Sequence, residues 1–113
     1  MNEMVKESFE SYCNYIAKMP NGCQQIADYL REDRIMEAGR IIAQFTEGLI
    51  WLVDMNKLLT PHNIVAALQE EQIFEFLSEI NNGLEIQDFV IVADMFEYEI
   101  KPFFEQQLEG LTN

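Results

Sequence analysis

The clearest helical pattern in the chain occupies residues 33–59, which read DRIMEAGRIIAQFTEGLIWLVDMNKLL. Apolar side chains recur there at steps of three and four residues, which places them on one face of an α-helix. They are Ile35, Ala38, Ile42, Phe45, Leu49, Leu52 and Leu59. Asn56 interrupts the stripe once, and consecutive apolar residues at 49–53 widen it around the helix. We therefore expect a helix that begins at an Asp33 cap and lies at the centre of a helical bundle.

A second stripe with the same spacing precedes this helix. Pro20-Asn21-Gly22 interrupts it with a strong breaker of helical structure, which would allow two short helices joined by a turn. The stripe nevertheless keeps its phase across the breaker, so we favour one long helix that is kinked near Pro20. The positions of the stripe are Phe9, Tyr12, Ile16, Met19, Cys23, Ile26 and Leu30.

Two more helices are predicted in the second half of the chain. Thr60, with a proline after it, is suited to cap the start of a third helix, and Gly83 is suited to end it. Asp88 is a suitable cap for the last helix, which contains Pro102 and should be kinked there. Helices joined by short links pack as antiparallel neighbours. The sequence thus predicts an all-α fold, a four-helix up-and-down antiparallel bundle that forms a single domain over residues 1–113.

A weak internal similarity relates residues 33–38 to residues 88–93 at an offset of 55. Both segments begin with an Asp cap and end with an Ala on the apolar stripe. Any two capped amphipathic helices can be aligned in this way, which is the simpler explanation. The alternative is a duplicated helical hairpin.

The chain is strongly acidic. Its 113 residues include 20 acidic side chains against 7 basic ones, which gives a formal net charge of −13. The half from residue 58 onward holds 11 of the acidic side chains and a single base, Lys101, so it alone carries −10. A negative surface repels phosphate, so we expect neither nucleic acid nor an anionic membrane as a partner.

The sequence lacks the features that are typical of membrane and secreted proteins. No segment approaches the roughly 20 apolar residues of a membrane-spanning helix. The first residues lack the basic and apolar regions of a secretory signal. Cys13 and Cys23 are too few to stabilise a secreted fold through disulfides. We therefore expect a cytoplasmic protein with two reduced thiols.

No arrangement typical of an enzyme stands out, so we expect neither a catalytic site nor a cofactor. The glycines are scattered singly rather than gathered in a phosphate-binding loop, and His62 is the only histidine. Carboxylates offer an alternative, because helical bundles can hold metals with inward-facing acidic side chains. That alternative function is a metal or small-ligand site built from Glu97 with Asp94 or Glu47.

Apolar residues that lie beside the helical seams give the main functional hypothesis. Ile50, Trp51 and Val53 widen the central stripe, and Phe103 and Phe104 are adjacent, so that one neighbouring helix cannot bury both. An apolar strip with acidic surroundings is typical of a dimer interface or a peptide-binding groove. We therefore expect a non-enzymatic interaction module, adaptor-like or chaperone-like, whose partner is a second copy or a basic, amphipathic protein segment. The competing explanation is a central helix that is buried all round.

Two stretches resemble a known family. Residues 45–53 read FTEGLIWLV, and residues 87–102 read QDFVIVADMFEYEIKP. Both resemble stretches that recur in a family of small uncharacterised helical proteins of Firmicutes-type bacteria. The resemblance implies a bacterial origin and a helical architecture, and it assigns no activity and no functional residue.

Overall fold

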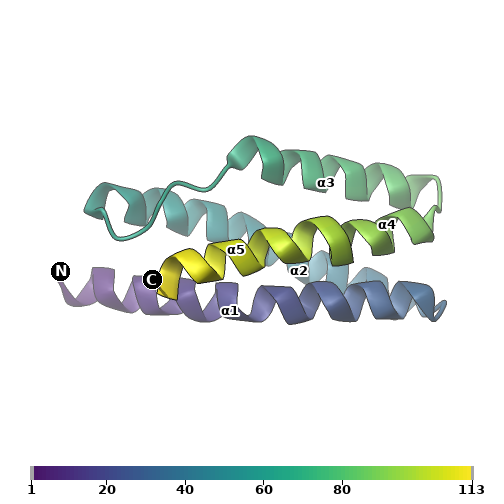
Figure 1. Cartoon of the computed structure of the whole chain (residues 1–113), viewed down its shortest axis with the longest axis horizontal. Coiled ribbons are helices and arrows are strands. Elements are labelled where there is room, and N and C mark those ends of the chain that lie inside the picture. The colour runs from purple at the N-terminus through teal and green to yellow at the C-terminus, as the bar shows by residue number, and fades with distance from the viewer. Residues whose placement is uncertain (1, 113) are drawn as a thin grey trace.

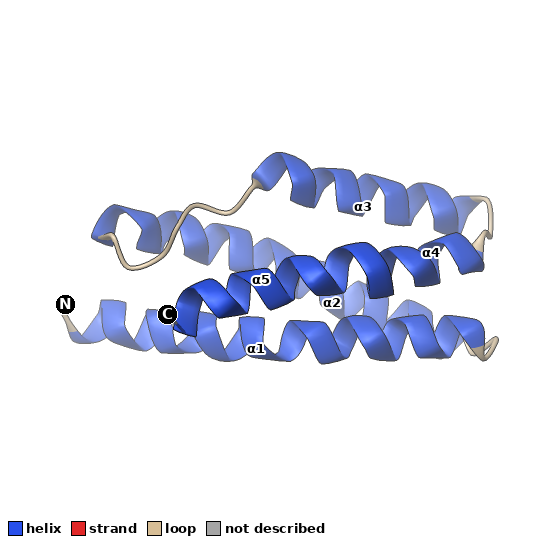
Figure 2. Cartoon of the chain, viewed as in Figure 1, coloured by secondary structure: helices blue, strands red, loops and turns tan. Residues whose placement is uncertain are grey.

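The structure, a computed structural model that describes residues 2–112, consists of helices joined by short links (Figure 2). Three rods come first: α1 (Glu3–Arg31), α2 (Ile35–Leu59) and α3 (Glu70–Glu85). The fourth, here called the C-terminal rod, joins α4 (Phe89–Met95), a π-helical turn (Phe96–Ile100) and α5 (Lys101–Thr112) without a break. Successive rods run in opposite directions along the long axis (Figure 1). The predicted all-α, up-and-down four-helix bundle is confirmed, and no strand occurs in the part of the chain that the structure describes.

α1 is a single helix that runs through Pro20, so the one-helix interpretation of the N-terminal third is correct. Its start is capped by Asn2, whose side-chain oxygen accepts a hydrogen bond from the Val5 amide at 2.8 Å. Pro20 is buried among apolar neighbours. The stripe that kept its phase across the breaker is therefore one continuous buried face, and it overrides the local signal of Pro20-Asn21-Gly22.

The α1–α2 and α3–α4 turns have the same backbone form and correct two predicted caps. Asp33 and Gln87 adopt left-handed φ angles of 61° and 57°. In each turn the next amide bonds back five residues, from Arg34 to the Tyr29 carbonyl and from Asp88 to the Gly83 carbonyl, at 2.9 Å. Arg34 occupies the N-cap position of α2, and the left-handed Asp33 lies one residue before it. Asp33 therefore does not cap α2.

The predicted Asp88 cap is confirmed, whereas the predicted end of α3 at Gly83 is wrong. Asp88 Oδ1 accepts a hydrogen bond from the Ile91 amide at 3.1 Å. Gly83 lies inside α3, where it allows α4 to approach, and the helix ends at Glu85. The two turns correspond at an offset of 54 rather than 55. Because short helical hairpins use few turn geometries, this correspondence alone does not distinguish a duplication from a recurring turn.

The predicted third helix begins too early. Thr60–His62 forms only a 3₁₀ turn, Asn63 is left-handed at φ 60°, and α3 starts at Glu70. The intervening residues 63–69, here called the strap, are irregular because their backbone bonds to the buried side chain of Asn56 instead of forming a helix. This correction matters for function, because the strap and not a helix covers one end of the bundle.

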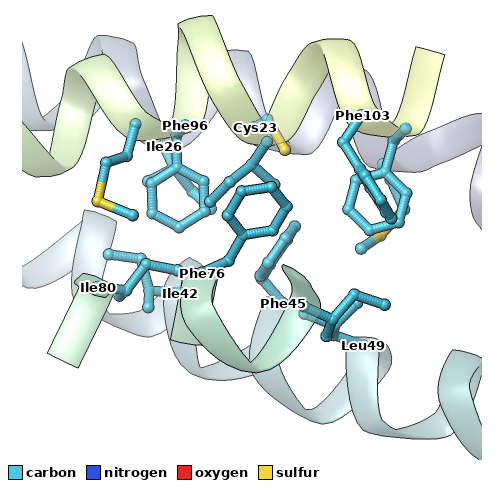
Figure 3. Packing of buried hydrophobic residues seen from close by; sticks show 14 of the residues in the cluster. Cys23, Ile26, Ile42, Phe45, Leu49, Phe76, Ile80, Phe96 and Phe103 are labelled. Atoms are coloured by element: carbon cyan, nitrogen blue, oxygen red, sulfur yellow. The ribbon is translucent and has the colours of Figure 1, made fainter. Parts of the chain in front are cut away.

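Aromatic side chains from three rods fill the core (Figure 3). The Phe45 ring meets Phe96 edge-on at 5.3 Å, and Phe76 meets Phe103 in the same way at 5.5 Å. The irregularity predicted near Pro102 takes the form of the π turn directly before it, in which the Lys101 amide bonds to the Phe96 carbonyl.

Within residues 2–112, no helix is long and apolar enough to cross a membrane.

Candidate functional site

The interaction strip was predicted either around Ile50, Trp51 and Val53 or around Phe103 and Phe104, and the structure places these residues in different environments. Phe103 and Phe104 are buried, with 6% and 0% of their surfaces exposed. Their rings are nearly perpendicular and pack against Phe76 and Phe45 respectively. One neighbour indeed cannot bury both rings, but the interior of the bundle offers two, α3 and α2. The prediction of an exposed strip at these two residues is therefore wrong.

Trp51 also lies apart from the other candidates. It is half-buried and its ring centroid is 5.4 Å from that of Tyr15 on α1. Tyr15 itself passes directly over Gly48, where an added Cβ would collide with its ring. Trp51 thus belongs to the contact between α1 and α2, because a step of one residue turns a helical side chain by about 100° from Ile50.

Ile50 and Val53 line an apolar groove between α2 and α3. Ile50 is 53% exposed at the edge of this groove, and Val53 is buried at its floor. Phe74, 60% exposed, lies on the opposite wall. The hollow has a volume of about 120 Å³. Here it is called the α2–α3 groove, and its lining residues are Leu49, Ile50, Val53, Asp54, Lys57, Ile73, Phe74 and Leu77.

Sequence reasoning missed Phe74, which is not among the predicted interaction residues. The buried face of α3 is formed by Ile73, Phe76 and Ile80, at steps of three and four residues. Phe74 lies one residue after the first of them and therefore points away from the core. The spacing 73, 76, 80 was the signal that could have shown this, once the helix was known to start at Glu70.

The groove is open because α3 packs on the C-terminal rod. Its backbone approaches α4 more closely than α2 (Figure 1). The apolar side chains of α2 that face α3 are consequently covered only in part. Each wall therefore exposes one large apolar side chain beside the same hollow, which makes the groove a candidate binding surface.

α3, which forms one wall of the groove, carries an excess of acidic side chains. At one end of the groove, Lys57 Nζ lies 3.1 Å from Glu70 Oε1. α3 contains five acidic residues and no basic one. Of these, Glu71, Glu75 and Glu79 are exposed, as the spacing of four predicts for a solvated face. The lining of the groove itself includes one acidic side chain, Asp54, and one basic side chain, Lys57, so the excess negative charge comes from the exposed face of α3 and not from the lining.

The carboxylates of the alternative hypothesis are bound by an arginine. Arg31 lies 3.0 Å from Asp94 and 2.6 Å from Glu97, and Gln24 donates a hydrogen bond to Glu97 at 2.9 Å. The hydrogen bonds from Gln24, Tyr98 and Arg31 lower the pKa of Glu97 to about 2. This polar cluster joins α1 to the C-terminal rod.

The same cluster does not have the form of a metal centre. Glu47 is exposed on α2 and takes no part in the hydrogen bonds around Arg31. Among residues 2–112, no group of three or more His, Cys, Asp or Glu side chains is placed to hold a metal ion. The carboxylates here are neutralised by a protein cation, which leaves the α2–α3 groove as the stronger candidate.

Comparison with known proteins places the chain in a family. A family model described as a domain of unknown function (DUF8042) matches residues 7–109. No curated protein and no solved structure matches the chain. The matched region includes α2, α3 and the strap in full and most of α1 and the C-terminal rod. The chain therefore belongs to the family of this domain of unknown function, DUF8042.

Proposed function

We propose that this protein is a non-enzymatic interaction module whose α2–α3 groove binds an amphipathic helix of a basic partner protein. The observation that carries the proposal is the pair Ile50 and Phe74, both more than half exposed on opposite walls of one apolar groove. A helix bound in such a groove inserts apolar side chains spaced by three, four and seven residues. Burying the two exposed side chains would supply a favourable free energy on binding.

Charge supports a basic partner over a second copy of this chain. Two molecules that each carry −13 repel one another, and the repulsion is strongest near α3 and the C-terminal rod. A segment rich in Lys or Arg would instead be attracted to the acidic α3 helix beside the groove, which favours rapid and selective association. The homodimer is therefore the second candidate. We also propose that the protein is bacterial and cytoplasmic, so its partner would be another protein of the bacterial cytoplasm.

A model peptide provides a direct test. The probe is an 18-residue helix with leucines on one face and lysines on the other, and its matched control carries glutamates in place of the lysines. Binding to the protein is measured by fluorescence anisotropy at physiological ionic strength. We expect saturable binding of the lysine peptide and none of the glutamate peptide.

Variants show whether the groove is responsible. The double variant Ile50→Ser with Phe74→Ser should weaken binding of the lysine peptide at least about tenfold, since each substitution removes most of an apolar contact. Val90→Ser with Ile91→Ser is the matched control, because these residues are 70% and 51% exposed on α4, outside the groove. Equal losses in both variants would contradict the proposal. A sedimentation mass of two chains, reduced to one by the groove variant, would instead favour the homodimer.

A further inference from the structure

A second hollow lies between α1, the strap and α5, toward the end of the bundle where the two termini lie (Figure 1). It is a cleft with a volume of about 370 Å³. α3 begins only at Glu70, so the strap is what covers the core on this side. Tyr12 and Ile16 come from α1, residues 63–66 from the strap, and Gln107 and Leu111 from α5. The cleft is therefore built from three separate parts of the chain.

The lining of this cleft carries no charged side chain, although 24% of the chain is Asp, Glu, Lys or Arg. Its polar side chains are the amides of Asn63, Gln106 and Gln107 and the hydroxyl of Tyr12. A charged ligand would lose its hydration here without gaining a counter-charge. The lining is thus suited to an uncharged molecule with both polar and apolar parts.

The hydrogen bonds of Asn56 determine whether the Tyr12 hydroxyl acts as donor or acceptor toward this amide. Asn56 Nδ2 donates to the Ala66 carbonyl at 3.0 Å, and Asn56 Oδ1 accepts from the Leu68 amide at 3.1 Å. These two backbone partners exclude the flipped amide, in which oxygen would face oxygen and nitrogen would face nitrogen. The remaining contact, from Nδ2 to the Tyr12 hydroxyl at 3.0 Å, must therefore be donated by Asn56.

The hydroxyl proton of Tyr12 consequently needs another acceptor. No such acceptor is found among residues 2–112, although the side chain is only 2% exposed. Burial raises the pKa of Tyr12, so the hydroxyl keeps its proton and remains a donor. Tyr12 and Ala66 both line the cleft, and the Tyr12 hydroxyl and the Ala66 carbonyl accept from the same Asn56 nitrogen, so the hydroxyl lies close to this part of the lining. A buried donor without an acceptor is costly, so an acceptor inside the cleft would be favourable.

The geometry points to this cleft as a binding site for a small uncharged carboxamide, whose carbonyl oxygen accepts the hydrogen bond of the Tyr12 hydroxyl. The amides of Gln106 and Gln107 match the donor and acceptor groups of the ligand's own amide. Ile16 and Leu111 provide apolar surface for its hydrocarbon part. This site is independent of the α2–α3 groove, because the two hollows share no lining residue.

Three probes of similar carbon skeleton test the chemical class. They are isovaleramide, which is neutral, isovalerate, which is an anion, and isopentylamine, which is a cation. Each is titrated into ¹⁵N-labelled protein while amide chemical shifts are recorded. We expect saturable shifts at Val65, Ala66 and Gln107 with isovaleramide alone. Absence of saturable shifts, or equal shifts with all three probes, would overturn the assignment and leave water as the acceptor.

Two variants locate the bound molecule. Tyr12→Phe removes the hydroxyl donor and should weaken the binding of isovaleramide about three- to tenfold. Gly110→Leu places a side chain on the lining at an exposed helical position with open space around it, and it should abolish saturable binding. Gly39→Leu is the matched control, since Gly39 is equally open but lies on α2 outside the cleft, and binding should be unchanged. Unaltered binding by the Gly110 variant would overturn the proposed site, even if Tyr12→Phe failed to fold.

Discussion

At the scale of single residues, Gly83 shows that the bundle has no room for one methyl group between α3 and α4. A Cβ at this position would lie 2.6 Å from Val92 Cγ2. Val92 is fully buried, and its β-branched side chain has little freedom to rotate away. Glycine inside a helix costs about 0.5–1 kcal/mol relative to alanine, so the close approach of the two helices must offset this cost.

Gly83→Ala should therefore destabilise the fold, against the usual effect of alanine in a helix. Overpacking costs about 1–3 kcal/mol, and the helix propensity returns at most about 1 kcal/mol, so a net loss of about 1 kcal/mol is expected. Gly39→Ala is the control: no atom lies within 4 Å of its added Cβ. It should stabilise the protein by about 0.5–1 kcal/mol. Urea unfolding measures both, and a stabilising Gly83→Ala would contradict the packing described.

At the scale of elements, the strap depends on one polar side chain. Asn56 is 4% exposed and makes three hydrogen bonds, with Tyr12, Ala66 and Leu68. The bonds with Ala66 and Leu68 satisfy backbone groups of a segment that has no helical ladder of its own. A buried polar residue on an apolar stripe therefore specifies where α3 can begin.

Asn56→Leu keeps the size of the side chain and removes all three hydrogen bonds. The Ala66 carbonyl and the Leu68 amide would lose partners, at about 1–3 kcal/mol for each buried group, so we expect a loss of about 3 kcal/mol in the free energy of unfolding. Hydrogen exchange should become faster at Leu68. Asn81→Leu, at an exposed position of α3, should change stability by less than about 0.5 kcal/mol. Similar losses in both variants would show that Asn56 does not anchor the strap.

Helices with a long apolar stripe could be predicted from the sequence, whereas the strap could not. α1 and α2 follow from periodicity, since a buried face extends from Tyr12 to Leu30 in α1 and from Ala38 to Leu59 in α2. The strap arises from contacts between Asn56 and residues ten and twelve positions away, which no local pattern encodes. The candidate site shows the same division: Ile50 could be found on the widened stripe, but Phe74 became visible only with the true start of α3.

The contact between α1 and the C-terminal rod should depend on pH. The hydrogen bonds from Gln24, Tyr98 and Arg31 lower the pKa of Glu97 from 4.5 to about 2. A carboxyl with a lowered pKa in the folded state adds stability above its unfolded pKa, and this stability is lost as pH falls through the folded value. Protonation of Glu97 therefore destabilises the fold between about pH 4.5 and pH 2.

Glu97→Gln removes this titration. The melting temperature of the variant should fall less steeply than that of the unaltered protein over the same pH range, starting from a lower value at pH 7 because the pair with Arg31 is lost. Glu99→Gln, an exposed neighbour outside the Arg31 cluster, serves as the control and should keep the original slope. Identical slopes for the Glu97 variant and the unaltered protein would show that this carboxylate does not couple to folding.

At the scale of the whole molecule, the charge is uneven and acts on stability as well as on partner choice. The half from residue 58 onward carries −10 of the −13, with Lys101 as its one base. Lys101 is itself engaged, because its ammonium donates to Gln24 at 3.0 Å. On α3 the exposed row Glu71, Glu75 and Glu79 places like charges four residues apart, which destabilises a helix slightly at each pair. A basic partner lying against this side would relieve the repulsion.

Glu75→Lys turns both like-charged pairs of this row into opposite-charged ones. We expect a gain of about 0.5–1 kcal/mol in the free energy of unfolding at low salt, since each pair changes sign. The gain should shrink in about 0.5 M NaCl, where the charges are screened over a few ångströms. Glu75→Gln, which only removes the repulsion, should give about half of the gain. The lysine variant should also bind the leucine–lysine peptide more slowly, because steering depends on the field of α3. If the gain in stability persisted unchanged in high salt, it would come from helix propensity. Repulsion among the carboxylates of α3 would then not limit the stability of this bundle.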